Sequence, residues 1–403
     1  MINVAILGFG VVGGGTARLI TDNSKEIERL TGEYVNIKYI LDLRDFPDSP
    51  FADRIVHDFN IILSDPEIHT VIEVMGGSHP AYEFTVAALS AGKNVVTSNK
   101  EVVANFGDEF LAIAKKTGTS YRFEAAVGGG IPVISPIISS VRHNKINEVR
   151  GILNGTTNYI LTKMFSFGDS FEDSLRDAQE RGYAERNPDA DILGTDASRK
   201  IAILASLVTG KLVSTDRIHT EGITEIRKAD VVAAERLGMK IKLLGRCIKN
   251  GDGAFIMVAP FMLPADSALY SVSGVFNAVE VSGEPIGSVM FYGPGAGAGP
   301  TASAVVADLT EIIASGRNYA VPNIVRDDGF VQDFSEFVCA SYVALDGACE
   351  KCVSSVFGEV TFVESTDSVA FVTPPMSERE IAEKLKRLAS ERGAVVKSRI
   401  RLA

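Results

Sequence analysis

The chain has 403 residues, of which 46% are hydrophobic and 23% are charged, and its formal net charge at pH 7 is −11. This length predicts two or three domains, and the acidic balance argues against a nucleic-acid partner, because clustered Lys and Arg bind the phosphate backbone. No apolar run reaches the roughly 20 residues that span a bilayer, no cationic secretory leader opens the sequence and four cysteines are too few for a disulfide scaffold, so we expect a cytoplasmic protein without a membrane partner.

The first third of the chain alternates short β-rich runs with amphipathic stretches. Helices are predicted over Ala81–Ala91 and Glu101–Lys116, and a glycine ends each of them. This alternation predicts an α/β domain over residues 1–140, with a parallel sheet, helices on both faces and a ligand at the carboxyl ends of the strands. The predicted strands are Asn3–Leu7, Val35–Leu41, Val71–Val74, Asn94–Thr97 and Ser120–Glu124.

A glycine-rich turn follows the first predicted strand. The sequence GFGVVG at residues 8–13 fits the G-x-G-x-x-G fingerprint, whose glycines make the tight turn, admit a pyrophosphate and let the helix pack on the strand. The alternative is a strand–turn–helix whose glycines serve sterics alone. At the end of the second strand, Asp42 favours the ribose hydroxyls of NAD, whereas Arg44 favours the 2′-phosphate of NADP. Both residues share one face of the strand, so the choice of cofactor stays open.

Residues 141–320 predict a mixed α/β domain. The β-rich runs are Glu148–Leu153 and Phe255–Pro260. A predicted hinge, Gly293–Gly299, precedes a helix over Ala302–Ser315 that is expected to return to the first domain. The other predicted helices are Tyr159–Phe165, Phe171–Arg181, Ala197–Val208 and Lys228–Leu237.

Residues 333–403 follow a β-α-β-β-α-β order, which is typical of a ferredoxin-like module that senses a small ligand or mediates dimerisation. The second helix begins at a capping box, Ser377–Glu380, and ends at Gly393. Cys349 and Cys352 form a C-x-x-C, which a zinc or redox site could use but which lacks the partners of either, and we interpret them as small residues on a half-buried helix. The predicted strands are Ser335–Leu345, Val360–Val363, Val369–Val372 and Ala394–Ile400, and the first helix is Ala348–Phe357.

Two segments of the first domain carry chemical groups at the expected ligand edge. VVTSNK ends the fourth strand with Lys100, which either binds a carboxylate, a phosphate or a reacting oxygen, or is simply solvated. FEAAVGGGIPVI follows the fifth strand, and its glycines and Pro132 force a turn that exposes carbonyl groups. Such a turn suits close backbone approach, a monovalent cation or a plain crossover between domains.

The segment GYAERNPDADILGTDASRK, residues 182–200, is the most informative. It places carboxylates on a loop that leads into a helix, and these are Glu185, Asp189, Asp191 and Asp196. Asp196 and Lys200 are four residues apart and share a helix face, which in a surface loop would be a weak exposed salt bridge. The helix that follows is strongly apolar, so we expect the pair to lie near buried surface, where the lysine suits proton transfer and the acids suit an ammonium group.

These motifs occur in the order seen in homoserine dehydrogenases, which the chain resembles over essentially its whole length. They are GFGVVG, EVMGG, VVTSNKEVVA, EAAVGGGIPVI, GILNGTTNYIL, GYAERNPDADILGTDASRKIAIL and GPGAGAGPTASAVVADL. The resemblance implies an NAD(P)-dependent oxidoreductase that interconverts L-homoserine and L-aspartate 4-semialdehyde in threonine and methionine biosynthesis. It implies a Rossmann domain, a substrate-binding and dimerisation domain over residues 141–320 and an ACT-like domain over residues 333–403, in a homodimer or homotetramer.

The resemblance also implies roles for single residues. Lys200 matches the proton donor for semialdehyde reduction, Asp196 its partner in orienting the substrate hydroxyl, and Lys100 the lysine between cofactor and substrate. The residues implied around the substrate amino group are Glu185, Asp191 and Thr156. The implied pyrophosphate contacts are Phe9, Gly10, Val12 and Gly13, and the backbone carbonyls of an implied structural sodium site are those of Glu124, Val127, Gly129 and Ile131. Arg44 stands where members often carry a base, which favours NADP over NAD.

The chain departs from the family in three regions, one of which is Ser267–Leu269, where relatives often have His-Pro-Leu. Asn187 replaces an acid in the loop, and the usual start of the ACT-like part is replaced at residues 345–348, which argues against threonine feedback and leaves assembly as its role. Two other functions stay open. One is a related dehydrogenase for another short amino acid such as aspartate, and the other is a non-catalytic sensor of nucleotides and amino acids.

Overall fold

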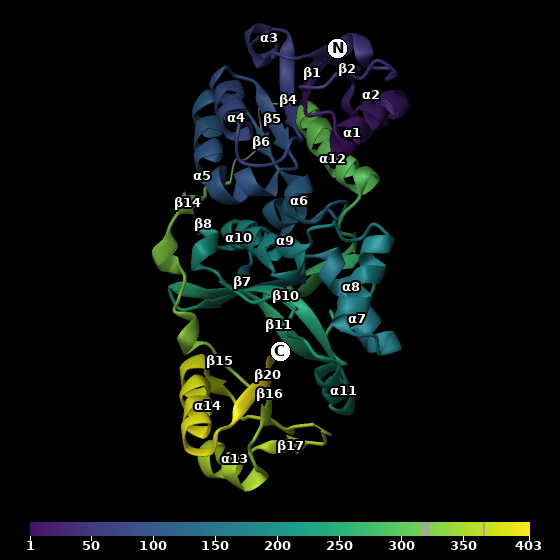
Figure 1. Ribbon diagram of the computed structural model, residues 1–403. Coiled ribbons are helices and arrows are strands. Elements are labelled where there is room, and N and C mark those ends of the chain that lie inside the picture. Colours follow the sequence, from purple (N-terminus) through teal and green to yellow (C-terminus); the bar gives the residue numbers. More distant parts are fainter. Residues whose placement is uncertain (317–321, 366) are drawn as a thin grey trace. The chain divides into compact units, whose positions relative to one another are not determined.

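The computed structural model describes residues 1–316, 322–365 and 367–403, and it divides the chain into two compact units. The first unit comprises Met1–Lys145, Ala202–Thr215 and Gly293–Asp328, and the second comprises Ile146–Ile201, Asp216–Tyr292 and Gly329–Ala403. Each unit therefore combines segments that are distant in sequence, as the colours of Figure 1 show. None of the described helices is long and apolar enough to cross a membrane.

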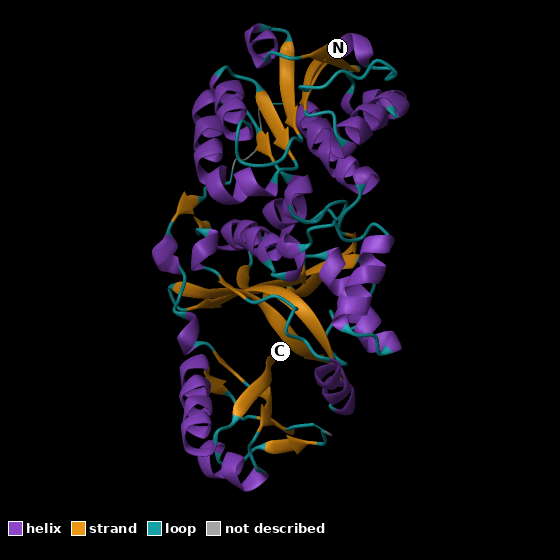
Figure 2. Ribbon diagram, viewed as in Figure 1, coloured by secondary structure: helices purple, strands orange, loops and turns teal. Residues whose placement is uncertain are grey.

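The first unit is built on a six-stranded sheet in which all pairs are parallel, so the predicted α/β domain with a parallel sheet is confirmed. The strand order is β3-β2-β1-β4-β5-β6, so the chain adds β2 and β3 on one side of β1 and β4 to β6 on the other side. The carboxyl ends of β1 and β4, where this order changes sides, flank the expected ligand crevice. Helices cover both faces of the sheet (Figure 2). The strands are β1 Ile2–Leu7, β2 Val35–Leu41, β3 Ile55–Val56, β4 Ile68–Glu73, β5 Asn94–Thr97 and β6 Tyr121–Arg122. The helices are α1 Val11–Asp22, α2 Ser24–Thr31, α3 Phe59–Ser64, α4 Ala81–Ser90, α5 Lys100–Thr117, α6 Ile134–Pro136 and α12 Ala298–Ser315.

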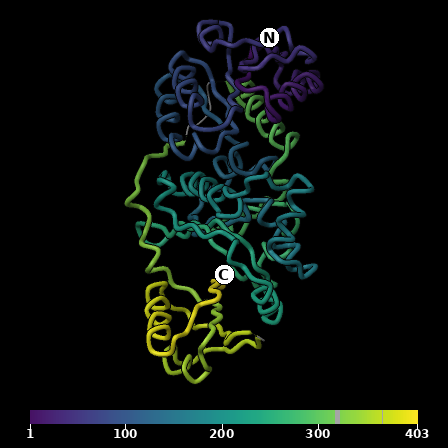
Figure 3. Tube along the Cα trace, in the orientation of Figure 1, coloured from purple at the N-terminus to yellow at the C-terminus, as the bar shows by residue number. Residues whose placement is uncertain are grey.

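Helix α12 packs against α1 although almost 300 residues separate them in the sequence, and Figure 3 follows the chain as it returns to lie beside α1. Val305 and Leu309 of α12 belong to one buried cluster with Ile6 and Ile20 of the first strand and helix. Gly15 lies where the two helices meet, since a β-carbon there would be 3.3 Å from the backbone oxygen of Ala298. This close approach explains one of the glycines that extend the fingerprint.

The second unit is built on a ten-stranded sheet, which confirms the predicted mixed α/β domain. Its strand order is β13-β12-β7-β10-β11-β20-β16-β18-β17, with β9 beside β11. The strands are β7 Lys145–Ile152, β9 His219–Thr220, β10 Met239–Asn250, β11 Gly253–Pro264, β12 Phe276–Glu284, β13 Gly287–Pro294, β16 Ser341–Asp346, β17 Thr361–Val363, β18 Val369–Val372 and β20 Val395–Leu402. The helices are α7 Gly155–Phe167, α8 Phe171–Glu180, α9 Asp189–Ile192, α11 Lys228–Arg236, α13 Glu350–Phe357 and α14 Glu378–Arg392, together with the first part of α10 Thr195–Thr209, whose residues from Ala202 on belong to the first unit. The second unit also has a two-stranded pair formed by β15 Val338–Cys339 with β19 Met376–Ser377, whereas the pair formed by β8 Lys211–Leu212 with β14 Val325–Arg326 belongs to the first unit.

Strand β10 was not predicted from the sequence. In the structure Lys242 is buried, and its Nζ donates to Asn158 Oδ1 at 3.0 Å and to the Val272 backbone oxygen at 2.5 Å. Burial lowers the pKa of Lys242 to about 7. The cost of burying the lysine is therefore reduced both by these acceptors and by access to the neutral form.

The C-terminal elements run in the order β16-α13-β17-β18-α14-β20 and share their sheet with the middle of the chain. Strand β20 pairs antiparallel with β16 and, at Arg401 and Leu402, parallel with β11. The predicted strand over Ser335–Leu345 is wrong in its first part. The Asp333 carboxylate accepts from Ser335 N at 2.9 Å and turns the chain before β15 and β16 begin.

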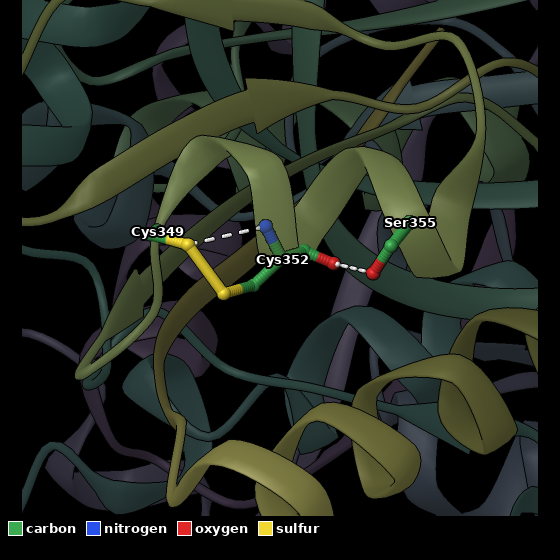
Figure 4. The surroundings of a disulfide bond; sticks show 3 residues. All are labelled: Cys349, Cys352 and Ser355. Atoms are coloured by element: carbon green, nitrogen blue, oxygen red, sulfur yellow. Dashed lines mark hydrogen bonds between the residues drawn. A yellow bond between two sulfur atoms is a disulfide. The ribbon is translucent and has the colours of Figure 1, made fainter.

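Cys349 and Cys352 are joined by a disulfide, so their interpretation as two small helical residues is wrong (Figure 4). Cys349 is the N-cap of α13 and not a residue within it, and its Sγ accepts from Cys352 N at 3.2 Å. The N-cap conformation brings the two Cα atoms to 5.1 Å, which is within the range of disulfides.

Candidate functional site

The glycine-rich turn joins β1 to α1 in the first unit. Gly8 has φ of +95°, which favours glycine, and Gly10 is the N-cap of α1. A β-carbon on Gly13 would lie 1.9 Å from the Gly8 backbone oxygen, so the third fingerprint position requires glycine. The first turn of α1, with Val12, points unpaired backbone N–H groups toward the turn, an arrangement that binds phosphate.

The end of β2 places Asp42, Arg44 and His57 together beside this turn. Asp42 Oδ2 accepts from Phe9 N at 2.8 Å, and the Arg44 guanidinium binds both carboxylate oxygens of Asp42 at 3.0 and 3.1 Å. These hydrogen bonds, chiefly those of Arg44, lower the pKa of Asp42 to about 2. His57 Nδ1 lies 2.7 Å from the Asp42 backbone oxygen and Nε2 lies 3.1 Å from Asp45 Oδ1. Both acceptors favour the charged ring and raise the pKa of His57.

A cavity of about 470 Å³ opens between the ends of β1, β2 and β4. Gly8, Gly10 and Arg44 line one part of it, and the rings of Phe59 and Phe84, stacked at 4.1 Å between centroids, lie in another part. Flat apolar walls beside polar groups suit a nucleoside. The sequence analysis did not identify His57, Phe59 or Phe84, because only the folded chain brings these segments together.

Lys100 is the first residue of α5, at the carboxyl end of β5. The preceding Asn99 is the N-cap, and its Nδ2 donates to the Gly77 backbone oxygen at 2.8 Å. Beneath it the buried Glu73 carboxylate accepts from Thr97 Oγ1 at 2.6 Å, and burial raises the pKa of Glu73. This network holds the start of α5, and so the backbone of Lys100, at the ligand edge of the sheet.

The glycine turn after β6 is organised by the Glu124 carboxylate. It accepts from the backbone N–H groups of Val133, Ile134 and Ser135 at 2.6 to 2.8 Å, while Glu124 N donates to Asp308 Oδ2 at 2.8 Å. Burial and the neighbouring Glu124 raise the pKa of Asp308 to about 8. The residues of the predicted sodium site are all buried in this turn, namely Glu124, Val127, Gly129 and Ile131. The sodium site itself stays a prediction.

The second unit brings Lys200 and two of the predicted acids together around Asn154. Lys200 Nζ lies 2.8 Å from Asp196 Oδ2 and donates to the Leu153 backbone oxygen at 2.8 Å. Asn154 Nδ2 donates to Asp191 Oδ1 at 2.7 Å and to Asp196 Oδ2 at 3.0 Å. Lys200 is 8% exposed and Asp196 is 3% exposed, so the pair is not the weak surface bridge of the alternative interpretation.

Asn154 was missed by the sequence analysis, although the N-cap pattern of its motif could have revealed one of its two roles. Its Oδ1 accepts from Thr157 N at 2.9 Å and caps α7, which leaves its amide N–H group free to face the acids. Thr156 Oγ1 donates to the Tyr183 backbone oxygen at 2.6 Å and so ties α7 to the acidic loop. Glu185 lies exposed on that loop, where its backbone oxygen accepts from Gln179 Nε2 at 3.1 Å.

The Lys200 cluster can stabilise and protonate an oxygen on which negative charge develops. An ammonium group held by a carboxylate and a carbonyl is oriented before the substrate arrives, and its field is strong where water is excluded. The Asp191 carboxylate, at the same cluster, suits a substrate cation.

Two family models match the chain, one described as homoserine dehydrogenase at residues 132–310 and one as homoserine dehydrogenase, NAD binding domain, at residues 8–124. The homoserine dehydrogenase of Pseudomonas aeruginosa is 42% identical over 77% of this chain and 72% of its own length, and that of Helicobacter pylori is 36% identical over 92% and 86%. A crystal structure of a homoserine dehydrogenase from Thiobacillus denitrificans has a TM-score of 0.91 at 33% identity and covers 100% of this chain and 98% of its own. A hyperthermophilic archaeal homoserine dehydrogenase mutant in complex with NADPH has a TM-score of 0.68 at 28% identity, over 79% and 99%.

Replacing Gly13 by alanine should greatly weaken dinucleotide binding, because the new methyl group would displace the Gly8 carbonyl from which it lies 1.9 Å away. We expect the dissociation constant for NADPH, measured by fluorescence titration, to rise at least about tenfold, which is a loss of 1.4 kcal/mol. Gly14→Ala is the matched control, since its methyl group would meet nothing closer than Arg18 Nη2 at 4.0 Å. Equal affinities of the two variants would contradict the assignment of the turn.

Proposed function

The chain belongs to the homoserine dehydrogenase family of NAD(P)-dependent oxidoreductases acting on a CH–OH group, and we propose that it interconverts L-homoserine and L-aspartate 4-semialdehyde. The observation that carries this proposal is the buried Lys200–Asp196 pair beside Asp191 and Asn154. These groups suit a small substrate with both a reacting oxygen and an ammonium group. The reaction would serve threonine and methionine biosynthesis, as the resemblance implies.

In this proposal a bound nicotinamide dinucleotide supplies or accepts the hydride, and residues of the chain supply position and the proton. Lys200 donates its proton to the semialdehyde oxygen, and Asp196 holds the lysine and orients the hydroxyl. Glu185, Asp191 and Thr156 receive the substrate amino group. Lys100 lies on the cofactor-binding unit and would act between cofactor and substrate.

The first unit holds an NAD(P)-binding domain, and the groups around its turn fit such a cofactor. The space beside Gly10, where a β-carbon would meet nothing within 4 Å, leaves room for a pyrophosphate near Phe9, Val12 and Gly13, and the cavity beside Arg44 suits the adenosine part. We infer a preference for NADP, because Arg44 and His57 both line this cavity and the Arg44 guanidinium suits a 2′-phosphate. The NADPH complex of the archaeal relative supports this choice.

A structural sodium ion is part of the proposal. The Glu124 carboxylate is occupied by three backbone N–H groups, which leaves carbonyl oxygens of the turn as its donors. The carbonyls of Glu124, Val127, Gly129 and Ile131 would hold the ion and stiffen the turn. Nothing in the proposed chemistry requires this ion to touch the substrate.

We propose three domains, with boundaries at residues 1–140, 141–320 and 333–403, and an ACT-like character for the last. Its order of elements and its strand order β20-β16-β18-β17 support a ferredoxin-like module. The proposed assembly is a homodimer or homotetramer. Strand β13 supports it, because this sheet edge exposes Met290 and Tyr292, which a second copy could cover.

Lys200→Ala tests the function directly. Removing the proton donor should lower kcat for semialdehyde reduction by roughly 100- to 10,000-fold, as for the loss of a general acid. The measurement is NADPH oxidation in the presence of L-aspartate 4-semialdehyde, with the exposed Lys249→Ala as the control. Full activity of Lys200→Ala, or a wild-type chain that binds NADPH without reducing the semialdehyde, would refute the proposal.

The two directions of the reaction should respond oppositely to pH. Homoserine oxidation requires a neutral Lys200 that can accept the hydroxyl proton, whereas reduction requires the charged lysine that donates it. We therefore expect kcat for oxidation to rise and kcat for reduction to fall as the pH increases through the titration of the lysine. Initial rates in both directions between pH 6.5 and 10.5, roughly the range of perturbed lysines, measure this effect. Flat profiles would remove Lys200 from the proton-transfer step.

Arg44→Ala should shift the cofactor preference away from NADP. Losing a charge-assisted contact to the 2′-phosphate should raise KM for NADPH about tenfold or more and leave KM for NADH nearly unchanged. NADH is the internal control, because it lacks the phosphate. Parallel changes for both cofactors would show that Arg44 acts through Asp42 and the turn and not through the phosphate.

A further inference from the structure

We propose that the buried ion pair between Arg401 and Glu221 positions the acidic substrate segment 189–196, so that the C-terminal strand sets the affinity for the amino-acid substrate. This inference rests on the function proposed above for that segment. It assigns Arg401 and Glu221 as positioning residues, which touch neither substrate nor cofactor.

Arg401 lies on β20, is 2% exposed and binds two carboxylates at once. Its Nη1 and Nη2 donate to the Glu221 carboxylate at 2.7 and 2.8 Å, and its Nε and Nη2 donate to the Glu378 carboxylate at 2.8 and 3.0 Å. The ring of Phe334 lies against the guanidinium at 4.9 Å. A guanidinium with this number of contacts has a single orientation, and so has each carboxylate that it binds.

The ion pair joins two segments that share one edge of β11. Arg401 is in register with Phe261 of that strand, and Thr220 is in register with Val258. Glu221 N donates to the Val258 backbone oxygen at 2.8 Å. The backbones of β20 and of the segment that follows β9 are therefore both held by β11. The side-chain contact between Arg401 and Glu221 connects these two segments.

Residues 221–223 contact the acidic segment directly through the backbone. Ile223 N donates to the Ile192 backbone oxygen at 2.8 Å, and a β-carbon on Gly222 would lie 2.1 Å from that same oxygen. A β-carbon on Gly194 would be 3.2 Å from the Glu221 oxygen. Residues 221–223 therefore cannot move toward α9 without displacing its end.

The acidic residues of the site lie on either side of this contact. Asp191 precedes Ile192 in α9, and Asp196 lies in the first turn of α10, two residues after Gly194. Both accept from Asn154 Nδ2, at 2.7 and 3.0 Å, so a small displacement of α9 changes the geometry of both carboxylates. The route from Arg401 to Asp191 thus consists of the ion pair, one backbone turn and one hydrogen bond.

Loss of the pair would release Glu221 toward another partner. His219 Nε2 lies 2.6 Å from Glu221 Oε1, and Arg399 binds Glu378, so each carboxylate keeps one polar partner when Arg401 is removed. We therefore expect the fold to persist while the orientation of residues 221–223 is no longer fixed.

The test compares Arg401→Met, Glu221→Gln, their double variant and Gly222→Ala, which disturbs the same contact from the other side. Arg379→Met is the matched control, because Arg379, in α14, also pairs with a carboxylate, that of Glu336, but at the surface. We expect KM for homoserine to rise about tenfold in each of the first four variants, with KM for NADP unchanged. The double variant should resemble the single ones, since both remove the same interaction.

Amide hydrogen exchange keeps the inference separate from the proposed function. Exchange of the peptide that covers residues 189–196 should accelerate in Arg401→Met, Glu221→Gln and Gly222→Ala and stay at the wild-type rate in Arg379→Met. This readout needs no turnover, so an inactive wild-type chain would refute the function and leave the positioning role under test. Unchanged exchange in the milder Glu221→Gln variant, additive KM effects, or equal rises in KM for homoserine and NADP would overturn the positioning role.

Discussion

The second unit depends on how a lysine ammonium and an aspartate carboxylate are kept together out of water. Removing two such charges from solvent costs several kcal/mol each unless other polar groups replace the lost water. The chain supplies these groups by ending β7 at Ile152, so that the Leu153 carbonyl is free to accept from Lys200. It then begins α7 with Asn154, whose amide donates to Asp196. The polar groups at the junction of β7 and α7 therefore offset part of the desolvation free energy of the buried Lys200–Asp196 pair.

The cofactor-binding part of the first unit depends on a different interaction, in which the Asp42 carboxylate accepts hydrogen bonds from two separate groups. Its carboxylate holds the Phe9 N–H group and the Arg44 guanidinium together. An unpaired acid there would bind the ribose hydroxyls and repel a phosphate, but Arg44 neutralises the acid and adds donors of its own. Asp42 and Arg44, which favour different cofactors when each is considered alone, are thus bound to each other. The cofactor preference then depends on whether Arg44 can bind a 2′-phosphate while it stays paired with Asp42.

Local patterns in the sequence were enough for the elements whose causes are local. Strand β2 and the start of α14 at the Ser377 cap follow from alternation and capping, and both lie where the sequence predicts them. Strand β10 and the bond between Cys349 and Cys352 did not follow, because the burial of Lys242 depends on acceptors from other elements and the disulfide depends on the residue at which α13 begins.

The site shows the same division between local and distant causes. The spacing of Asp196 and Lys200 is a local pattern, and it places the two side chains on one helix face. Their partner Asn154 lies 42 residues before Asp196, and no pattern of spacing connects them. The two acids of this loop share that one amide, which only the folded chain reveals.

The C-terminal elements have the order of a separate module, but their strands belong to the same ten-stranded sheet as the middle of the chain. Strand β20 pairs with one edge of β11, in its last part, where Phe261 and Met262 are in register with Arg401 and Leu402. The residues of β20 that pair with β11 at this place are therefore more than 130 residues away in the sequence. The same edge carries β9, whose following turn lies against α9. If these elements were absent, the Glu221 carboxylate would lose its buried guanidinium and β11 would lose a neighbour at the place where that turn is held. In the positioning role proposed above, the C-terminal strand is thus part of the support of residues 189–196.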